Sequence, residues 1–486
     1  MSKEIINLEP KGLWKSFYDI TQIPHPSKHE KKLADFVKKF GEDLELETTV
    51  DEIGNIIIKK PATEGFEAMK GVILQAHLDM VPQKNNDTAH DFENDPIDAY
   101  IDGDWVTAKG TTLGADNGIG AAAAMAILES NEIKHGPVEA LFTIDEETGM
   151  TGAFGLKAGY LDGDILINMD SEDEGELYVG CAGGIDAEAQ FSYEEEKPPK
   201  SVKAFKLNVS GLKGGHSGLD IALGRGNSNK ILFRYLHHAI GKWGMRLASV
   251  DGGSLRNAIP RESFAIVTVP DENADKIEDC VAKFVEVVKN EISAAEPNFE
   301  MTATSVDIPD FIIEEEIQNK LVAAIYACPN GVIRMSDTME GVVETSTNMA
   351  IVKSENGKID VNCLLRSSVD SAKHDLTKMI ESVFVLAGAE IGFSGEYPGW
   401  KPNKDSDILR TMSNVYETKF GKTPEIKVIH AGLECGILGA VYPHWDMISF
   451  GPTIRFPHSP DEKVNIETVK MFWDFLLETL KNIPTK

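Results

Sequence analysis

The stretch GVILQAHLD, residues 71–79, decides how the whole chain is interpreted. Its apolar first part is typical of a buried strand in a parallel sheet, and the polar residues His77 and Asp79 follow at once. Two further apolar runs are also followed directly by acidic residues, namely VEALFTI at 138–144 and ILINM at 165–169. In an open α/β sheet the ligand site lies beyond the carboxyl ends of the strands, so we expect these side chains to meet at one edge.

Helical patterns alternate with these runs, which predicts an α/β domain with a mainly parallel sheet and helices on both of its faces. The Ala-rich run 121–129 is composed of strong helix formers. The alternation returns near the end of the chain, with apolar strands at 426–429 and 447–450 and an amphipathic helix at 466–480. Both ends of the chain are therefore expected to belong to one domain.

A differently built region separates these two parts. From 204 to 304 the expected order is strand, helix, two strands, helix and strand, which is the ferredoxin-like arrangement. A second, less regular unit follows, and its Asn356-Gly357 pair predicts a hairpin. We predict one α/β domain in two parts, 1–195 and 395–486, interrupted at 196–394 by an α+β domain of two ferredoxin-like units.

Charge and composition exclude several classes of partner. The 486 residues include 78 acidic and 48 basic ones, a formal net charge of −30, which disfavours nucleic acid and anionic membranes. Neither a signal peptide nor a run of roughly 18 apolar residues is present, so a cytoplasmic protein without membrane attachment is expected. The five cysteines form no CxxC pair, which argues against a disulfide framework or a thiolate metal site.

Histidines and carboxylates gather at the expected strand ends. They are His77 and Asp79 after the first run, Glu146 and Glu147 after the second, Asp170 after the third, Asp116 before the Ala-rich helix, and His458 after the run at 447–450. Taken singly, each is more often a solvated turn residue than a ligand. Several separate regions placing such residues at one edge favour a site for Zn²⁺, Mn²⁺ or Co²⁺, which bind imidazole and carboxylate groups.

The spacing of these residues indicates separate tasks. His77 and Asp79 are two apart in an extended segment and point to one face, so Asp79 can accept a hydrogen bond from the imidazole nitrogen that faces away from a metal. Glu146 and Glu147 are adjacent and point in different directions. One can therefore bind a metal while the other acts as a general base.

Six motifs, in their order along the chain, resemble one enzyme superfamily. They are HLDMVP at 77–82, GADNG at 114–118, DEETG at 145–149, NMDSEDEG at 168–175, GGHSG at 214–218 and PHSPDE at 457–462. This superfamily is that of the dinuclear zinc peptidases, which includes aminoacylase, glutamate carboxypeptidase and carnosinase. Within it, the chain is most similar to the aminoacyl-histidine dipeptidases, also called cytosol non-specific dipeptidases.

The resemblance implies two Zn²⁺ per chain, with Co²⁺ or Mn²⁺ as substitutes. Asp116 matches the residue that bridges both ions, and it is followed in the family by a cis peptide bond, here to Asn117. The other matched ligands are His77 and Asp170 for one ion and Glu147 and His458 for the second. Glu146 matches the general base that takes a proton from a metal-bridging water, and Asp79 matches the carboxylate that supports the ligand His77.

The interrupting domain corresponds to a lid in this superfamily. His216 matches a lid histidine that stabilises the tetrahedral oxyanion. Asn257 and Arg366 match positions that hold the C-terminal carboxylate of the substrate, for which a guanidinium fork is well suited. Glu434 in HAGLECG has two open interpretations, a partner for the free α-amino group of the substrate or a capping or surface residue.

The sequence therefore predicts a metallo-dipeptidase that hydrolyses unblocked dipeptides of broad composition, including Xaa-His. One alternative within the same fold is an aminoacylase, desuccinylase or carboxypeptidase that acts on N-acylated amino acids. A catalytically inactive binding protein is disfavoured because every ligand and base position is filled. A homodimer is an open alternative, since the lid histidine crosses a dimer interface in short-lid relatives, whereas a doubled lid can place His216 over its own active site.

Overall fold

The computed structural model describes residues 2–486, with side chains from Lys3 onward, and divides into two compact units. Unit 1 comprises Met1–Gly180, Pro402–Val428 and Leu433–Lys486, and unit 2 comprises Cys181–Lys401 and Ile429–Gly432. The first crossing lies earlier than the expected boundary at residue 195, because the strand at Gly183–Ser192 pairs within the sheet of unit 2. In the described part of the chain, no helix combines the length and the apolar character that a membrane crossing requires.

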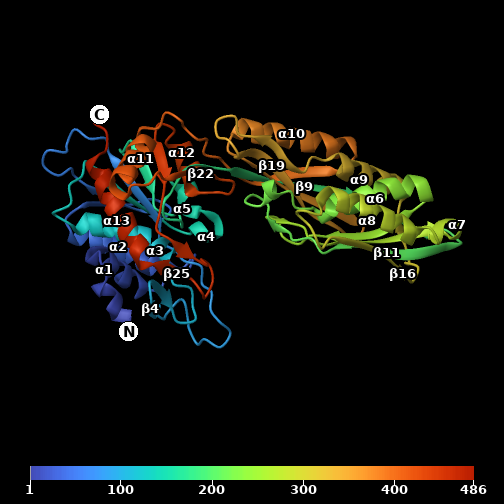
Figure 1. The fold of residues 1–486 in the computed structure, drawn as a ribbon, viewed down its shortest axis with the longest axis horizontal. Coiled ribbons are helices and arrows are strands. Elements are labelled where there is room, and N and C mark those ends of the chain that lie inside the picture. Colours follow the sequence, from blue (N-terminus) through green and yellow to red (C-terminus); the bar gives the residue numbers. More distant parts are fainter. Residues whose placement is uncertain (1) are drawn as a thin grey trace. The chain divides into compact units, whose positions relative to one another are not determined.

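Unit 1 contains one large sheet and one small sheet (Figure 1). Most of its helices belong to its first and last segments, Met1–Gly180 and Leu433–Lys486. Its strands are β1 Glu47–Val50, β2 Ile56–Lys60, β3 Val72–His77, β4 Ala99–Asp102, β5 Trp105–Ala108, β6 Val138–Thr143, β7 Ile165–Asn168, β8 Glu176–Cys181, β22 Glu425–Ile429, β23 Asp446–Ser449, β24 Ile454–Arg455 and β25 Lys463–Asn465. Its helices are η1 Ser2–Asn7, α1 Lys11–Thr21, α2 Lys31–Asp43, α3 Ala115–Glu129, α4 Glu146–Gly149, α5 Thr151–Gly155, α11 Asp407–Phe420, α12 Glu434–Val441 and α13 Ile466–Lys481.

The large sheet of unit 1 is mixed, in the order β1-β2-β6-β3-β7-β23-β8-β22. Its four central strands, β6, β3, β7 and β23, are parallel to one another. The prediction of a mainly parallel sheet is correct for this centre, whereas β1, β2 and β8 run antiparallel to their neighbours. The central strands were recognisable because they are buried on both faces and therefore apolar throughout.

Helix α3 carries the Ala-rich run and packs between α1 and strand β3. Ala121–Ala124 are at most 1% exposed, and the small side chains let the helix approach the sheet closely. Leu13, Trp14 and Phe17 of α1 are fully buried on the other side. This packing fixes the start of α3, where Asp116 lies, relative to the end of β3.

Unit 2 is built around one long antiparallel sheet, in the order β16-β11-β15-β13-β19-β20-β9-β21, with β18 added beside β19. Its strands are β9 Gly183–Ser192, β10 Glu195–Glu196, β11 Val202–Ser210, β12 Gly215–His216, β13 Arg246–Gly252, β14 Ala258–Ile259, β15 Ser263–Pro270, β16 Glu300–Val306, β17 Ile312–Ile313, β18 Gly331–Met335, β19 Val343–Glu355, β20 Lys358–Ser367 and β21 Glu390–Tyr397. Its helices are η2 Ile221–Leu223, α6 Ser228–Trp243, α7 Asp271–Ala274, α8 Ile277–Ile292, α9 Glu315–Ala327 and α10 Asp370–Leu386. The predicted hairpin joins β19 to β20, and Asn356 and Gly357 have φ angles of 52° and 75°, as a tight two-residue turn requires.

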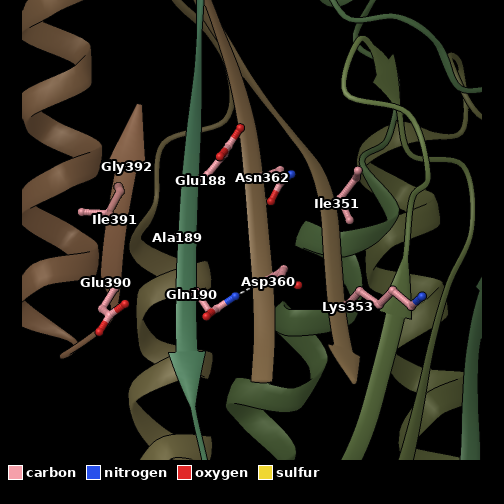
Figure 2. A pocket seen from close by; sticks show the side chains of 10 residues that line it. All are labelled: Glu188, Ala189, Gln190, Ile351, Lys353, Asp360, Asn362, Glu390, Ile391 and Gly392. Carbon is pink, nitrogen blue, oxygen red and sulfur yellow. Dashed lines mark hydrogen bonds between the residues drawn. The ribbon is translucent and has the colours of Figure 1, made fainter. Parts of the chain in front are cut away.

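The two faces of this sheet differ in character. Helices α6, α8, α9 and α10 share one apolar core with the sheet, to which β20 contributes Ile359, Val361, Cys363 and Leu365 (Figure 1). Because side chains alternate along a strand, the even-numbered residues of β20 point to the opposite face. Figure 2 shows this face, with Asp360 and Asn362 of β20 beside Glu188 and Gln190 of β9. Arg366 continues the same row at the end of the strand.

Candidate metal centre and lid cluster

The three neighbouring strands β6, β3 and β7 bring the predicted metal ligands to one edge of the sheet. His77 is the last residue of β3 and pairs in register with Thr143, the last residue of β6. Two residues earlier, Gln75 of β3 pairs with Asn168, the last residue of β7. The acidic residues that follow β6 and β7 therefore start at the level of His77, as the spacing predicted.

Two groups of side chains share Asp116. Nε2 of His77 lies 3.2 Å from Oδ1 of Asp116 and 3.3 Å from Oδ1 of Asp170. Nε2 of His458 lies 3.2 Å from Oδ2 of Asp116 and 3.0 Å from Oε1 of Glu147. One carboxylate thus offers a different oxygen to each group. The ligand atoms within each group all lie within 4.8 Å of one another, close enough to surround a cation.

The donor chemistry of these groups fits transition-metal ions. Oε1 of Glu147 is buried and accepts no hydrogen bond, although the imidazole of His458 lies beside it, which is how two ligands of one cation are arranged. Burial raises the pKa of Asp170 to about 7, and the neighbouring Asp116 carboxylate raises the pKa of His458 to about 11. Imidazole and carboxylate without thiolate is a donor set suited to Zn²⁺, Mn²⁺ or Co²⁺.

The carboxylate of Asp79 connects the predicted ligand His77 to the segment that carries Glu146 and Glu147. Its Oδ1 accepts a hydrogen bond from the backbone N–H of Glu146 at 2.8 Å, and its Oδ2 accepts one from Glu147 at 3.2 Å. Nδ1 of His77 lies 3.0 Å from the backbone carbonyl of Asp79 and 3.4 Å from its carboxylate. Burial opposes ionisation, yet His77 and these donors lower the pKa of Asp79 to about 2. The carboxylate is therefore ionised and orients both neighbours.

Glu146 and Glu147 begin the short helix α4, directly after a strained residue. Asp145 has φ 50° and ψ 48°, a left-handed conformation that is unfavourable for a residue with a side chain. Hydroxyl groups of Thr148 and Thr151 donate hydrogen bonds to its carboxylate and hold this turn. Burial raises the pKa of Glu146 well above its ordinary value, which gives the side chain the proton affinity that a general base needs.

Two supporting residues were missed by the sequence interpretation. Glu462 is 2% exposed, and its two carboxylate oxygens accept hydrogen bonds from four consecutive backbone N–H groups, those of residues 113–116, at 2.8 to 3.3 Å. Ser27 donates a hydrogen bond from Oγ to Oδ2 of Asp79 at 2.8 Å. Glu462 lies within the PHSPDE motif, but its partners are more than 340 residues away in sequence, so no local pattern indicates this contact. The peptide bond between Asp116 and Asn117 is cis, as the resemblance implied.

Glu434 lies at the start of α12 with 0% exposure. Its Oε2 accepts hydrogen bonds from Nε2 of Gln75 at 2.6 Å and from Oγ1 of Thr143 at 2.9 Å, whereas its Oε1 is buried without a partner. Burial raises the pKa of Glu434 to about 7. These contacts join β3 to Thr143 of β6, which pairs with His77, and the burial of Glu434 excludes the surface role that the sequence had left open.

In unit 2 the structure brings together the three predicted substrate-binding residues of the lid. β12, which ends at His216, pairs with β14, which begins after Asn257, and the carbonyl of Asn257 accepts a hydrogen bond from Ser217 at 2.8 Å. The side chain of Asn257 is exposed. Nη2 of Arg366 lies 3.5 Å from Nε2 of His216. Arg366 is 5% exposed, and no carboxylate of the described residues lies within 4.0 Å of its guanidinium.

Comparison with known proteins gives matches over nearly the whole chain. The sequence profile of peptidase family M20/M25/M40 matches residues 73–482. The cytosol non-specific dipeptidase of Escherichia coli K12 is 48% identical over 483 residues, which are 99% of this chain and 100% of the relative. The crystal structure of aminoacylhistidine dipeptidase from Vibrio alginolyticus is 53% identical, covers 100% of both chains and superimposes with a TM-score of 0.96. A tripeptidase from Staphylococcus aureus shares the fold alone, with 15% identity, coverage of 98% of this chain and 99% of its own, and a TM-score of 0.56.

Proposed function

This chain belongs to peptidase family M20/M25/M40, and from this premise we propose that it is a metal-dependent dipeptidase acting on unblocked dipeptides, including Xaa-His. The observation that carries the proposal is the pair of ligand groups that share Asp116, whose two carboxylate oxygens face His77 and His458. The names of the Escherichia coli and Vibrio alginolyticus relatives support the substrate class. The name of the former also supports a cytosolic location.

We propose that two Zn²⁺, or Co²⁺ or Mn²⁺ in their place, are held by these residues. His77 and Asp170 would hold one ion, Glu147 and His458 the other, and Asp116 both. When bound, such ions act as Lewis acids toward the peptide carbonyl and make water a stronger nucleophile at neutral pH. The burial that raises the pKa of Asp170 supports this assignment, because carboxylates kept out of water need cations as partners.

Within this reaction we assign the proton transfers to Glu146. Its carboxylate would take a proton from the attacking water and later deliver it to the leaving amine. The raised pKa supports the second step, because a base that holds its proton firmly can also carry it to the amine. Asp79 would keep the backbone of Glu146 and the ring of His77 in place and would itself remain ionised.

The residues of unit 2 would recognise the substrate. Arg366, a buried guanidinium without a carboxylate partner, is suited to hold the C-terminal carboxylate, with Asn257 beside it. His216 accepts hydrogen bonds at Nδ1 from the N–H groups of Gly218 and Leu219, so its proton is on Nε2 and is free to stabilise the oxyanion. We interpret unit 2 as a lid of two ferredoxin-like units, because each set of four strands with its two helices has the order βαββαβ.

The decisive test removes the shared ligand. Asp116→Ala should abolish binding of both ions and reduce hydrolysis of a free dipeptide to the background of the assay, while the exposed Asp102→Ala should change neither. Metal content is measured by elemental analysis and turnover with a dipeptide and its N-acetylated form. A dipeptidase should reject the acetylated form. Preferential cleavage of the acetylated form would favour an aminoacylase or carboxypeptidase. If the wild type cleaves neither form, the alternative of a catalytically inactive binding protein would be favoured.

A further inference from the structure

His430 is a buried histidine that no step of the proposed reaction uses. It belongs to the short segment Ile429–Gly432 of unit 2 and is 8% exposed. Its Nε2 lies 2.8 Å from Oγ of Ser346, a hydrogen bond between two buried side chains. Its Nδ1 is buried and has no hydrogen-bond partner within the described residues. A polar nitrogen kept from water without a partner is unfavourable, so its retention needs an explanation.

His430 lies in the same cluster as Arg366. Ser346 of β19 and Arg366 of β20 are directly opposite each other in the sheet, so both side chains point away from the core that the sheet shares with α6, α8, α9 and α10. Gly218 closes the cluster, because a Cβ at this residue would lie 1.8 Å from the carbonyl oxygen of His430 and 3.1 Å from Cδ of Arg366. We refer to His216, Ser346, Arg366 and His430 as the Arg366 cluster.

The Arg366 cluster offers hydrogen-bond donors but contains no negatively charged acceptor. Nη1 of Arg366 donates to the hydroxyl oxygen of Tyr397 at 3.0 Å, which leaves Nη2 directed toward His216. Since Nε2 of His216 carries the ring proton, the 3.5 Å contact between these two nitrogens joins two donors. Two donors that face each other without an acceptor between them favour negatively charged groups of a ligand, an oxyanion at His216 and a carboxylate at Arg366.

Both imidazoles of the cluster are neutral at the pH of the cytosol. Burial and then the charge of Arg366 lower the pKa of His430 to about 3, and the same two causes lower the pKa of His216 to about 4. The hydroxyl of Ser346 can donate to Nε2 of His430, in which case the single ring proton is on Nδ1. An anion beside the ring selects this tautomer, because the alternative would direct a lone pair at the negative charge.

We propose that His430 is a specificity-determining residue that donates a hydrogen bond from Nδ1 to the C-terminal carboxylate of the substrate, beside Arg366. Ser346 is a positioning residue, since it holds the ring and leaves the proton on Nδ1. The ligand class is therefore a peptide with a free α-carboxylate, and the neutral donor adds selectivity for that group without adding a second cation. This inference rests on the proposed dipeptidase function and extends it to a residue outside the motifs that define the metal centre.

Two substitutions of His430 separate its ring nitrogens. The amide of Asn can place a donor near the position of Nδ1, whereas the amide of Gln reaches the position of Nε2 and Ser346. His430→Gln should therefore lose the contact with the carboxylate, and His430→Asn should keep it. The matched control is His374→Gln, since His374 is exposed on α10 and pairs with Glu396.

The measurement compares kcat and KM for a dipeptide and for its C-terminal amide, with metal-loaded enzyme. For His430→Gln we expect KM for the dipeptide to rise about tenfold or more with kcat nearly unchanged, because a hydrogen bond to a charged group is lost. The amide should be affected little, so the preference for the carboxylate should fall by the same factor. His430→Asn should recover most of this preference, and His374→Gln should resemble the wild type.

Several outcomes would overturn the inference. Equal losses for the dipeptide and the amide would show a structural role, and so would a fall in kcat with KM unchanged. If His430→Gln does not fold, Ser346→Ala provides the same comparison, and an unchanged preference in that variant would count against the proposal. A wild type that cleaves neither substrate would refute the dipeptidase function itself, whereas an active wild type with indifferent variants would refute only the role of His430.

Discussion

The metal centre of unit 1 and the Arg366 cluster of unit 2 use histidine in opposite electrostatic surroundings. In the metal centre, carboxylates, chiefly that of Asp170, outweigh the effect of burial and raise the pKa of His77 well above its ordinary value. In the Arg366 cluster, burial and a guanidinium lower the pKa of His216 to about 4. The same side chain thus lies among carboxylates in one unit and beside a guanidinium in the other. The difference indicates which residues should affect metal binding and which should affect substrate affinity.

Loss of the proposed general base, Glu146, should have the largest effect on turnover. Glu146→Gln keeps the size of the side chain but removes its ability to take a proton, so kcat should fall by about 10²–10⁴-fold. Metal content should stay at the wild-type value, because Glu147 is untouched. Steady-state kinetics and elemental analysis of the same sample check both statements. The control is Glu132→Gln, a substitution at an exposed residue of unit 1. A near-normal kcat in Glu146→Gln would exclude Glu146 as the general base.

A substitution in unit 2 should separate affinity from metal binding. Arg366→Lys keeps the positive charge but loses the planar fork and the hydrogen bonds with Tyr397 and Ser217. We expect KM for a dipeptide to rise by about 10–100-fold, which corresponds to the loss of one or two charge-assisted hydrogen bonds. Metal content should not change. Arg234→Lys, at an exposed pair with Glu291, is the control, and loss of metal in Arg366→Lys would break the division of roles between the units.

For a physical reason, the sequence indicated which residues gather at the candidate metal centre but not which residues support them. The ends of β3, β6 and β7 meet because parallel strands place their carboxyl ends at one edge, so a list of residues after apolar runs already contains His77 and Asp170. Glu462 and Ser27 act through contacts with distant backbone and side chains, which leave no local pattern. His430 was missed because its partner, Ser346, is 84 residues away and its role depends on a strand register.

The same limit applies to the fold. The central strands of unit 1 were predicted because burial on both faces makes them apolar throughout. The expected boundary at residue 195 lies beyond strand β9, whose pairing with β20 and β21 depends on residues that follow more than 160 positions later. The antiparallel strands β1 and β2 are partly exposed, and hydrophobicity alone does not give the direction of a strand.

Glu462 offers a smaller perturbation of the candidate metal centre that leaves every predicted ligand in place. In Glu462→Gln an amide NH₂ group would replace one of the two oxygens that accept hydrogen bonds from the backbone N–H groups of residues 113–116. This NH₂ group is itself a donor and cannot accept those hydrogen bonds. Metal affinity should fall by about 10–100-fold, because Asp116 would no longer be held in its orientation. Competition with a chelating indicator measures this affinity. The adjacent exposed Asp461→Asn should bind metal like the wild type, and equal affinities in both variants would remove Glu462 from the support of the site.

The smallest expected effect concerns the pH dependence of stability and tests the neutral histidines of unit 2. The pKa of His216 is about 4 in the folded protein, below its ordinary value near 6.5, first because of burial and then because of Arg366. Between these two pH values the unfolded chain binds a proton that the folded protein does not, so the contribution of His216 to stability decreases as the pH falls through this window. His216→Gln lacks this contribution, and its free energy of unfolding should therefore decrease less steeply than that of the wild type between about pH 7 and about pH 5. Urea unfolding with a chelator present measures the difference without interference from acid release of metal. Parallel curves for the two proteins would mean that His216 is not held neutral, and the contrast between the two units would then be limited to the metal centre.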